Sequence, residues 1–369
     1  MAIKVAASRS GDMDALITAI GQPQVKAVIY FFSVACERLE PQKAIKRAFP
    51  QAACIGASMI GGWCSSGALD KGIVAMSLSV DEVEDAFILM QEGVKEAPSA
   101  AGKKILNAVK ARLTHRNISP NRYLGLIFFD GLCRGEEIMQ VFTWELGLNL
   151  PLIGGAAADE LTFTKTLVAA EEKISSDGVA VLIMKMKIPF FYSHYGHCTP
   201  ATTSFVITKA EPIKRIVWEI NQENAAAYYA KTIGVSSADN LQSGHFAKNP
   251  LGIVIGNAVY IRSISGVVDG KGLQFYCSLE EETEVHLLKP GDLIAHTHKA
   301  VQEAALYIPN IQGALLFNCV LRYLELQELK KTDAFNRLFS HLNCIGFNTY
   351  GEEFHIHHNQ TLTAVFFGR

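Results

Sequence analysis

The chain has 369 residues, of which 49% are hydrophobic, a formal net charge of −2 and a pI near 6.6. This length and composition allow a full hydrophobic core and two domains. Because the charge is balanced and no long run of Lys or Arg occurs, the sequence gives no electrostatic reason to bind nucleic acid or an anionic membrane.

The cysteines and the apolar segments indicate a soluble, cytoplasmic protein. The eight cysteines form no CxxC pair, so reduced thiols are expected rather than a disulfide framework or a zinc ribbon. The first residues lack the continuous apolar core of a signal peptide. The most apolar run, residues 178–184, is soon followed by Lys185 and Lys187, and we predict no membrane span.

One pattern occurs three times: an apolar strand, an amphipathic helix, a second strand that ends in Gly, and a third apolar strand. The first copy has strands at 28–33, 53–56 and 72–78 and a helix at 40–49. The second has strands at 123–130, 151–155 and 178–184 and a helix at 136–146. The third has strands at 313–319, 344–346 and 362–367 and a helix at 333–342. This recurrence predicts an α/β fold of mixed sheets flanked by helices, built from three similar β-α-β-β units; coincidence is the alternative.

A β-rich insertion separates the second and third copies. Short strands are expected at 190–194, 204–208, 252–255, 258–263, 273–278 and 283–288. Asp269-Gly270 predicts a hairpin turn, because Asp-Gly readily takes positive φ values. Further helices are predicted at 99–114, 221–233 and 292–306. We place a boundary near residues 187–189, which divides the chain into modules 1–188 and 189–369.

Polar side chains are concentrated where the strands of the third copy end. Cys319 and Arg322 follow one apolar strand, and Tyr350 and Glu352 follow the next. An Arg can hold a carboxylate through two parallel hydrogen bonds while the thiol contacts the rest of a ligand. Tyr350 would supply an aromatic wall and Glu352 an anion for an ammonium group, which suits an amino acid. The alternative is a buried structural Cys and an Arg paired with Glu325.

Glycines and amides near the same strand ends complete the predicted pocket. Gly154, Gly155 and Gly346 would let the backbone approach a ligand closely. Asn359 and Gln360 would add amide contacts, although strand alternation points them to opposite faces. A polar turn bonded to its own backbone is the alternative.

Two ordered series of segments resemble known modules. The first series is Phe128-Phe-Asp-Gly131, Pro151-Leu-Ile-Gly-Gly-Ala-Ala-Ala-Asp159 and Asp177-Gly-Val-Ala-Val181. The second is Tyr260-Ile-Arg262, Ala314-Leu-Leu-Phe-Asn-Cys319 with Arg322, Gly346-Phe-Asn-Thr-Tyr-Gly-Glu352 and His358-Asn-Gln-Thr-Leu362. The first series resembles the N-terminal module of FIST proteins, and the second resembles their C-terminal module. The resemblance covers almost the whole chain. It adds Asp159, Arg262, Phe347 and Gly351 to the predicted ligand-binding residues, with Arg262 helping Arg322 to orient an anionic group.

The resemblance implies an intracellular sensor that binds a small ligand, an amino acid or a related polar metabolite. Because the chain shows no added kinase, cyclase or F-box segment, the signal would pass to a separate partner such as a histidine kinase, a cyclase or a chemoreceptor component. The chain departs from the family pattern at Gly56-Ala-Ser-Met-Ile-Gly-Gly62, which lacks the usual acid, and at Asn318, where Ser is common.

A haem-binding nitric-oxide sensor is an alternative, because one branch of the family resembles such proteins. His194, His197 and Cys198 are residues of the type that ligates haem iron. The chain has no CxxCH attachment sequence, so haem would be held noncovalently. We predict no cofactor and keep haem as the alternative.

A metal site and an enzyme are further alternatives. His355 and His357 would share one face of a strand near Glu353, but a zinc site needs three or four protein ligands, so an exposed His-rich strand is the simpler interpretation. Cys319 with His358 as base would give a cysteine-dependent enzyme acting on a small metabolite. No P-loop, GxGxxG or GxSxG motif accompanies them, and we therefore prefer a binding protein to an enzyme.

Overall fold

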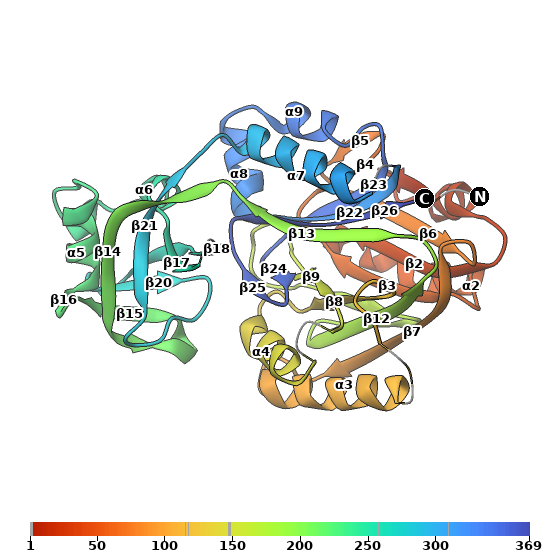
Figure 1. The fold of residues 1–369 in the computed structure, drawn as a ribbon, viewed down its shortest axis with the longest axis horizontal. Helices are drawn as coiled ribbons and strands as arrows, with labels where there is room; N and C mark the ends of the chain where they lie inside the picture. Colours follow the sequence, from red (N-terminus) through yellow and green to blue (C-terminus); the bar gives the residue numbers. More distant parts are fainter. Residues whose placement is uncertain (1–2, 115, 117, 147–148, 257, 309) are drawn as a thin grey trace. The chain divides into compact units, whose positions relative to one another are not determined.

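The computed structural model describes residues 3–114, 116, 118–146, 149–256, 258–308 and 310–369. The chain divides into two compact units. The first unit consists of Met1–Tyr195, Thr297–His357 and Thr361–Arg369, and the second of Gly196–His296 and His358–Gln360. All three copies of the predicted repeat lie in the first unit (Figure 1).

Each repeat contains the predicted β-α-β-β pattern, preceded by one more strand and helix and interrupted by a short hairpin. The first repeat comprises β1 (Lys4–Ser8), α1 (Met13–Ile20), β2 (Val25–Phe32), α2 (Pro41–Ala48), β3 (Ala53–Ser58), the hairpin β4 (Gly62–Cys64) and β5 (Gly67–Leu69), and β6 (Ile73–Ser79). The second comprises β7 (Val83–Glu92), α3 (Pro98–Leu113), β8 (Tyr123–Phe129), α4 (Gly135–Leu146), β9 (Leu152–Ala156), β10 (Val168–Ala170), β11 (Lys173–Ser175) and β12 (Gly178–Met186). The third comprises β13 (Phe190–Gly196), α7 (Leu293–Tyr307), β22 (Ile311–Cys319), α8 (Val320–Glu328), α9 (Thr332–Arg337), β23 (Asn343–Thr349), β24 (Glu352–Phe354), β25 (Ile356–His358) and β26 (Thr361–Gly368).

The three repeats build three sheets with the same strand order. The described strands run β1-β6-β2-β3-β10-β11 in the first sheet, β7-β12-β8-β9-β24-β25 in the second and β13-β26-β22-β23-β4-β5 in the third. In each repeat the two strands that flank the helix pair in parallel and the closing strand is antiparallel. The predicted fold of three similar units with a β-rich insertion is therefore confirmed.

The hairpins link the repeats into a ring. The hairpin β4–β5 of the first repeat pairs with β23 of the third, β24 of the third pairs with β9 of the second, and β10 of the second pairs with β3 of the first. We call each such place a hairpin junction. Every repeat thus completes the sheet of another repeat, which the sequence did not predict.

One hydrophobic core lies where the inner faces of the three sheets meet. Phe31, Phe128 and Phe317 occupy the same place in the three repeats, since each follows the residue that pairs with Gly56, Gly154 or Gly346. Their ring centroids are 5.5 to 6.1 Å apart, and Phe347 stacks on Phe31 at 4.3 Å. Each buried Phe stabilises the fold by about 1.5–3 kcal/mol, so this cluster holds the repeats together.

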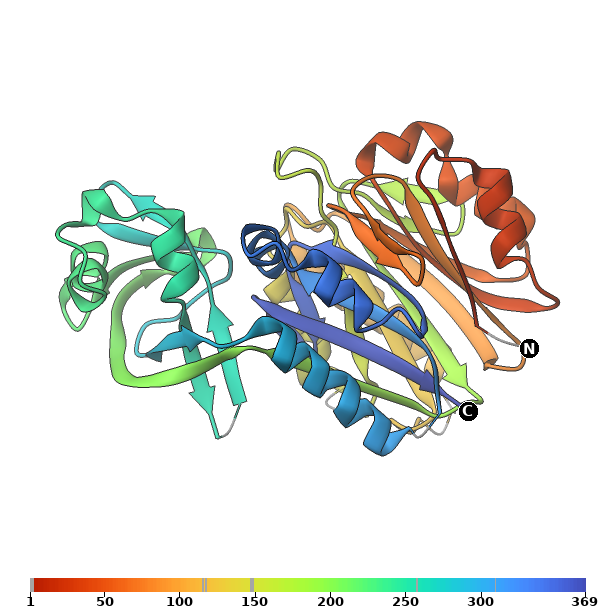
Figure 2. The same cartoon turned by 90° about the horizontal axis from the view of Figure 1, so that it is seen from above.

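Helices cover the outer faces of the sheets. Helices α1 and α2 lie on the outer face of the first sheet (Figure 2). Their apolar residues, such as Leu16 and Ile45, belong to one buried cluster with Val28 and Phe32 of β2. The neighbouring helices α3 and α4 cover the second sheet in the same way (Figure 1). This arrangement explains the amphipathic pattern of the predicted helices.

The second unit is the β-rich insertion, which enters the third repeat between β13 and α7. Its elements are β14 (Cys198–Glu211), β15 (Ile216–Ile220), β16 (Glu223–Asn224), α5 (Ala225–Thr232), α6 (Ser243–Lys248), β17 (Leu251–Ile255), β18 (Ala258–Arg262), β19 (Ile264–Val268), β20 (Gly272–Phe275) and β21 (Glu284–Pro290). The predicted hairpin turn is confirmed, with φ of 51° at Asp269 and 64° at Gly270. The module boundary at 188/189 falls just before β13 and stays a prediction.

Candidate ligand-binding site

The ends of β22 and β23 bring several predicted polar residues together. Cys319 pairs with Thr349 in the parallel ladder, and Asn318 pairs with Asn348. The Asn318 amide donates to Asn348 Oδ1 at 2.9 Å and its oxygen accepts from Arg322 Nε at 3.0 Å. Arg322, only 1% exposed, also donates to a hydroxyl of α7. A buried chain of hydrogen bonds therefore runs from Arg322 through Asn318 to Asn348.

Tyr350 and Asp159 come from different repeats and bond directly to each other. The Tyr350 phenol donates to the Asp159 carboxylate, which also accepts from four backbone N–H groups of residues 162–165 at 2.9 to 3.1 Å. Burial raises the pKa of Asp159, but the hydrogen bonds from Tyr350, Thr162 and the backbone outweigh it and hold the pKa well below its usual value. Phe163 stacks on the Tyr350 ring at 4.7 Å. This contact fixes the segment that follows β9.

Glu352 and Glu353 lie opposite the predicted glycines, since Glu352 pairs with Gly155 and Glu353 with Gly154. The Glu352 carboxylate accepts from the hydroxyl of Thr349 at 2.6 Å and from the N–H and hydroxyl of Thr361 at 3.1 and 2.9 Å. Burial raises the pKa of Glu352 to about 7, although these hydrogen bonds lower it. The Glu352 carboxylate is therefore held by residues at the ends of β23 and β26, two strands of its own repeat.

Glu353 has a partner on its own hairpin. Its carboxylate lies 2.7 Å from Nδ1 of His357, while its second oxygen has no hydrogen-bond partner among the described residues. Burial raises the pKa of Glu353 to about 7, and His357 lowers it.

The remaining predicted residues of the first unit are packed. Cys319 is 1% exposed and Phe347 is fully buried. A Cβ at Gly346 would lie 2.6 Å from the Trp63 indole, and one at Gly351 would lie 2.1 Å from the His357 ring, so both positions need glycine. The group that lies close to the Gly346 backbone is therefore a side chain of this protein, and close approach of a ligand there stays a prediction.

Arg262, Asn359 and Gln360 belong to the second unit. There Ser263 donates its hydroxyl proton to Gln360 Oε1 at 3.1 Å, and Asn359 donates to the carbonyl of His358 at 3.1 Å. Arg262 is half-buried and donates to the carbonyl of Ile261 at 3.1 Å. Their role in binding stays a prediction.

A hollow at the junction between β4–β5 and the third repeat lies beside the Arg322–Asn318–Asn348 chain. We call it the hairpin–helix hollow; its volume is about 30 Å³, and hairpin β4–β5, α8, α9 and β23 line it. The lining residues that the following argument uses are Trp63, Asp70, Tyr323, Gln327, Phe335 and Asn348. Asn348, the last residue in this chain of buried hydrogen bonds, forms part of the wall of the hollow.

Three aromatic rings shape this hollow. Trp63 pairs with Gly346 in the sheet and meets the Phe335 ring edge-on at 5.3 Å. Tyr323 accepts a hydrogen bond from Gln327 one turn further along α8. The Trp63 indole N–H is buried and has no hydrogen-bond partner among the described residues. A buried N–H without a hydrogen-bond partner is uncommon in folded proteins.

Sequence reasoning missed these lining residues. The segment Gly56–Gly62 was noted only for its missing acid, and nothing in the sequence indicated that the residues after it pair with the third repeat. Four hollows of the described structure, including the hairpin–helix hollow, have none of the thirteen predicted site residues in their walls.

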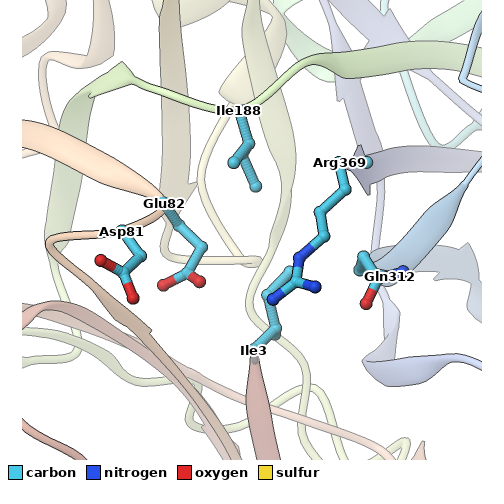
Figure 3. Close-up of a pocket in the computed structure, with 7 residues that line it drawn as sticks. Ile3, Asp81, Glu82, Ile188, Gln312 and Arg369 are labelled. Carbon is cyan, nitrogen blue, oxygen red and sulfur yellow. The ribbon is translucent and has the colours of Figure 1, made fainter. Parts of the chain in front are cut away.

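A larger hollow of about 160 Å³ lies at the opposite ends of the strands, near the start of β22. Figure 3 shows Asp81 and Glu82 on one side of it and Arg369 and Gln312 on the other. One Glu82 oxygen already accepts from the N–H and hydroxyl of Ser79, both at 2.7 Å. Since ligands of α/β sheets lie beyond the carboxyl ends of strands, we give preference to the hairpin–helix hollow.

The alternatives from the sequence can be located in the fold. His194 packs on Phe354 with a centroid distance of 4.6 Å, and burial lowers its pKa. His197 lies fully buried in the second unit. Cys319 and His358 belong to different units. The part of the chain that the structure describes holds no group of three His, Cys, Asp or Glu side chains placed to bind a metal ion. Haem binding and catalysis stay predictions.

The fold and its junctions define an α/β protein of three interlinked repeats with a small hollow at one junction. The FIST N domain matches residues 26–223 and the FIST C domain matches residues 225–355. The chain therefore belongs to the FIST family, whose domains are associated with sensing in signal transduction. No helix in the described ranges is both long and apolar enough to span a membrane.

Two known proteins are similar to this chain. The uncharacterized protein MJ1623 of Methanocaldococcus jannaschii is 26% identical over 329 residues, which are 79% of this chain and 63% of that protein. The chain thus spans less than two thirds of that relative. A solved chorismatase structure aligns over 100% of this chain and 98% of its own, with 8% identity and a TM-score of 0.36. A likeness this weak indicates neither a shared activity nor a shared substrate.

Proposed function

We propose that this protein is a sensor of a small polar metabolite, with the ligand held in the hairpin–helix hollow. The observation that carries the proposal is the presence, in a FIST protein, of a hollow with aromatic walls beside a buried polar chain. Amino acids and related compounds are the expected ligand class, as the family resemblance implies. The protein would act inside the cell and without a resident cofactor.

The buried chain supports this role by fixing Asn348. Its amide donates to the carbonyl of Ile60 at 2.9 Å, and its oxygen accepts from Asn318. Because Arg322 holds Asn318 in turn, the amide cannot rotate without breaking several buried hydrogen bonds. Arg322 and Asn318 are thus positioning residues in this proposal, and Asn348 forms a rigid part of the wall.

The site also suits signalling, because its walls come from two repeats. The hairpin β4–β5 belongs to the first repeat, whereas α8, α9 and β23 belong to the third. A ligand that contacts both walls binds better to one arrangement of hairpin and helices than to another, and such a difference is required for a ligand to shift an equilibrium. A separate signalling protein, such as a histidine kinase, a cyclase or a chemoreceptor component, would read the change.

Thermal-shift and calorimetric titrations with a panel of amino acids and amines test the proposal. Tyr323→Ala should weaken binding of any stabilising compound at least tenfold, because the side chain forms part of the wall. Leu324→Ala is the matched control, since Leu324 is the next residue of α8 and does not line the hollow. A panel without any binder, or equal affinity in both variants, would contradict the proposal.

A further inference from the structure

We infer that the hairpin–helix hollow selects an ammonium head group, so that the ligand is an organic amine whose cationic end enters the hollow. This inference rests on the proposed function and specifies its ligand class. It differs from the recognition of an amino-acid carboxylate by Arg that the sequence suggested.

The first argument is charge. Of the side chains that line the hollow in the described structure, Asp70 alone carries a formal charge. It is exposed and has no ion-pair or hydrogen-bond partner within the described residues. Its carboxylate lies close enough to Tyr323 to help raise the pKa of that phenol, after the larger effect of burial. A cation is therefore attracted here, and a carboxylate would meet a like charge.

The second argument is the aromatic walls. Trp63, Tyr323 and Phe335 all line the same small space, and Trp63 meets Phe335 at 5.3 Å. A cation within about 6 Å of an aromatic face is attracted by the negative charge density of the ring, most strongly by Trp. Aromatic rings with one acid at the mouth form a site for ammonium ions, whereas an anion gains nothing from those ring faces.

The third argument is size. A cavity needs a volume of about 10–15 Å³ to hold one water molecule. The hairpin–helix hollow, with a volume of about 30 Å³, therefore admits two or three groups of the size of water. This is enough for an alkylammonium end and too little for a whole amino acid. The rest of the ligand would therefore extend past Asp70 into solvent.

Arg322 does not change this charge balance. Its guanidinium is buried behind the wall and donates to Asn318 and Thr297. Arg322 thus supports the wall and does not line the hollow.

An NMR titration of the full chain tests the inference with three probes of equal carbon number. Propylamine is a cation, β-alanine a zwitterion and propionate an anion at neutral pH. The Trp63 indole N–H signal is assigned by its loss in Trp63→Phe. It should shift when propylamine is added and stay unchanged with propionate. β-Alanine should bind at least fivefold more weakly than propylamine.

Substitutions at two exposed acids complete the test. Asp70→Asn should weaken the binding of propylamine at least tenfold. Asp70→Glu should bind propylamine with an affinity within about threefold of that of the unmodified protein. Asp333→Asn is the matched control, because Asp333 is an exposed acid of α9 that does not line the hollow. Affinity should also fall as NaCl is raised, because the charge pair is partly exposed.

The outcomes separate the two proposals. Propionate binding as tightly as propylamine, or unchanged affinity in Asp70→Asn, would overturn the ammonium inference. If a compound of the wider panel still binds through Tyr323, the sensor proposal survives that result. A hollow that binds neither these probes nor any panel compound would overturn both.

Discussion

Trp63 and Glu353 occupy equivalent places in two hairpin junctions. Trp63 pairs with Gly346 at one junction, and Glu353 pairs with Gly154 at the other. Both are buried, and each has a polar atom without a hydrogen-bond partner among the described residues. The same backbone arrangement thus presents an aromatic ring in one place and a carboxyl group in the other.

The two junctions differ in what fills them. Glu353 bonds to His357 of its own hairpin, and Thr143 of α4 donates its hydroxyl to the carbonyl of His355. The hollow left there has a volume of about 10 Å³, against about 30 Å³ beside Trp63. The repeated backbone places a hollow at each of these two junctions. The side chains then determine whether that hollow is filled or left open.

The largest effect is expected from Asp159, which ties the segment after β9 to Tyr350. Asp159→Ala removes the acceptor of the Tyr350 phenol and of four backbone N–H groups. We expect the free energy of unfolding to fall by about 4 kcal/mol, measured by urea denaturation. The neighbouring exposed Glu160→Ala should change it by less than about 0.5 kcal/mol. A loss below about 1 kcal/mol for Asp159→Ala would show that this junction is not closed by the Asp159 network.

The next effect concerns pH. Because burial raises the pKa of Glu352 from 4.5 to about 7, the folded state binds a proton more tightly than the unfolded state. The resulting stabilisation is complete below about pH 4.5 and is lost as pH rises through about 7, by up to roughly 3 kcal/mol.

Glu352→Gln should remove this contribution, so that unfolding free energies at pH 5 and pH 7.5 become more similar than in the unmodified protein. Denaturation at several pH values measures the difference. The exposed Glu328→Gln of α8 should leave the dependence intact. If Glu352→Gln keeps the full dependence, the closed junction does not hold a proton at Glu352.

The smallest effect is expected at the third junction, where Ala169 pairs with Gly56. Lys46 of α2 forms an ion pair with Glu171 just after β10, and both side chains are partly exposed. Lys46→Met should therefore cost about 0.5 kcal/mol in urea denaturation, as exposed pairs do. Lys43→Met, which removes another exposed pair of α2, is the control. If Lys46→Met lowers the free energy of unfolding by more than about 2 kcal/mol, this ion pair contributes more to the junction than expected from packing alone.

The repeats could be predicted from the sequence because their strands are apolar runs and the second strand of each repeat ends in glycine. The core residues Phe31, Phe128 and Phe317 lie within those runs. The exchange of hairpins could not be predicted, because strands such as β4 and β10 have three residues each and carry too little pattern to indicate a distant partner.

Some of the predicted residues belong to polar networks near the strand ends, but none of them lines the hairpin–helix hollow. Tyr350 and Asp159 were both selected, and the structure joins them, but only the fold shows that they bond to each other. Arg322 was selected for its charge, whereas its burial behind Asn318 depends on tertiary packing. Trp63 and Asp70 were missed because they lie about 250 residues from the helices that face them.

The exchange of hairpins has a consequence for the integrity of the chain. Without a borrowed hairpin, β3, β9 or β23 would expose a row of unpaired backbone N–H and C=O groups. Such bare strands recruit other chains and promote aggregation. A proteolytic cut or truncation that removes one repeat therefore exposes a strand edge in another repeat. Fragments of this protein should aggregate through these edges, whereas the intact chain keeps them paired.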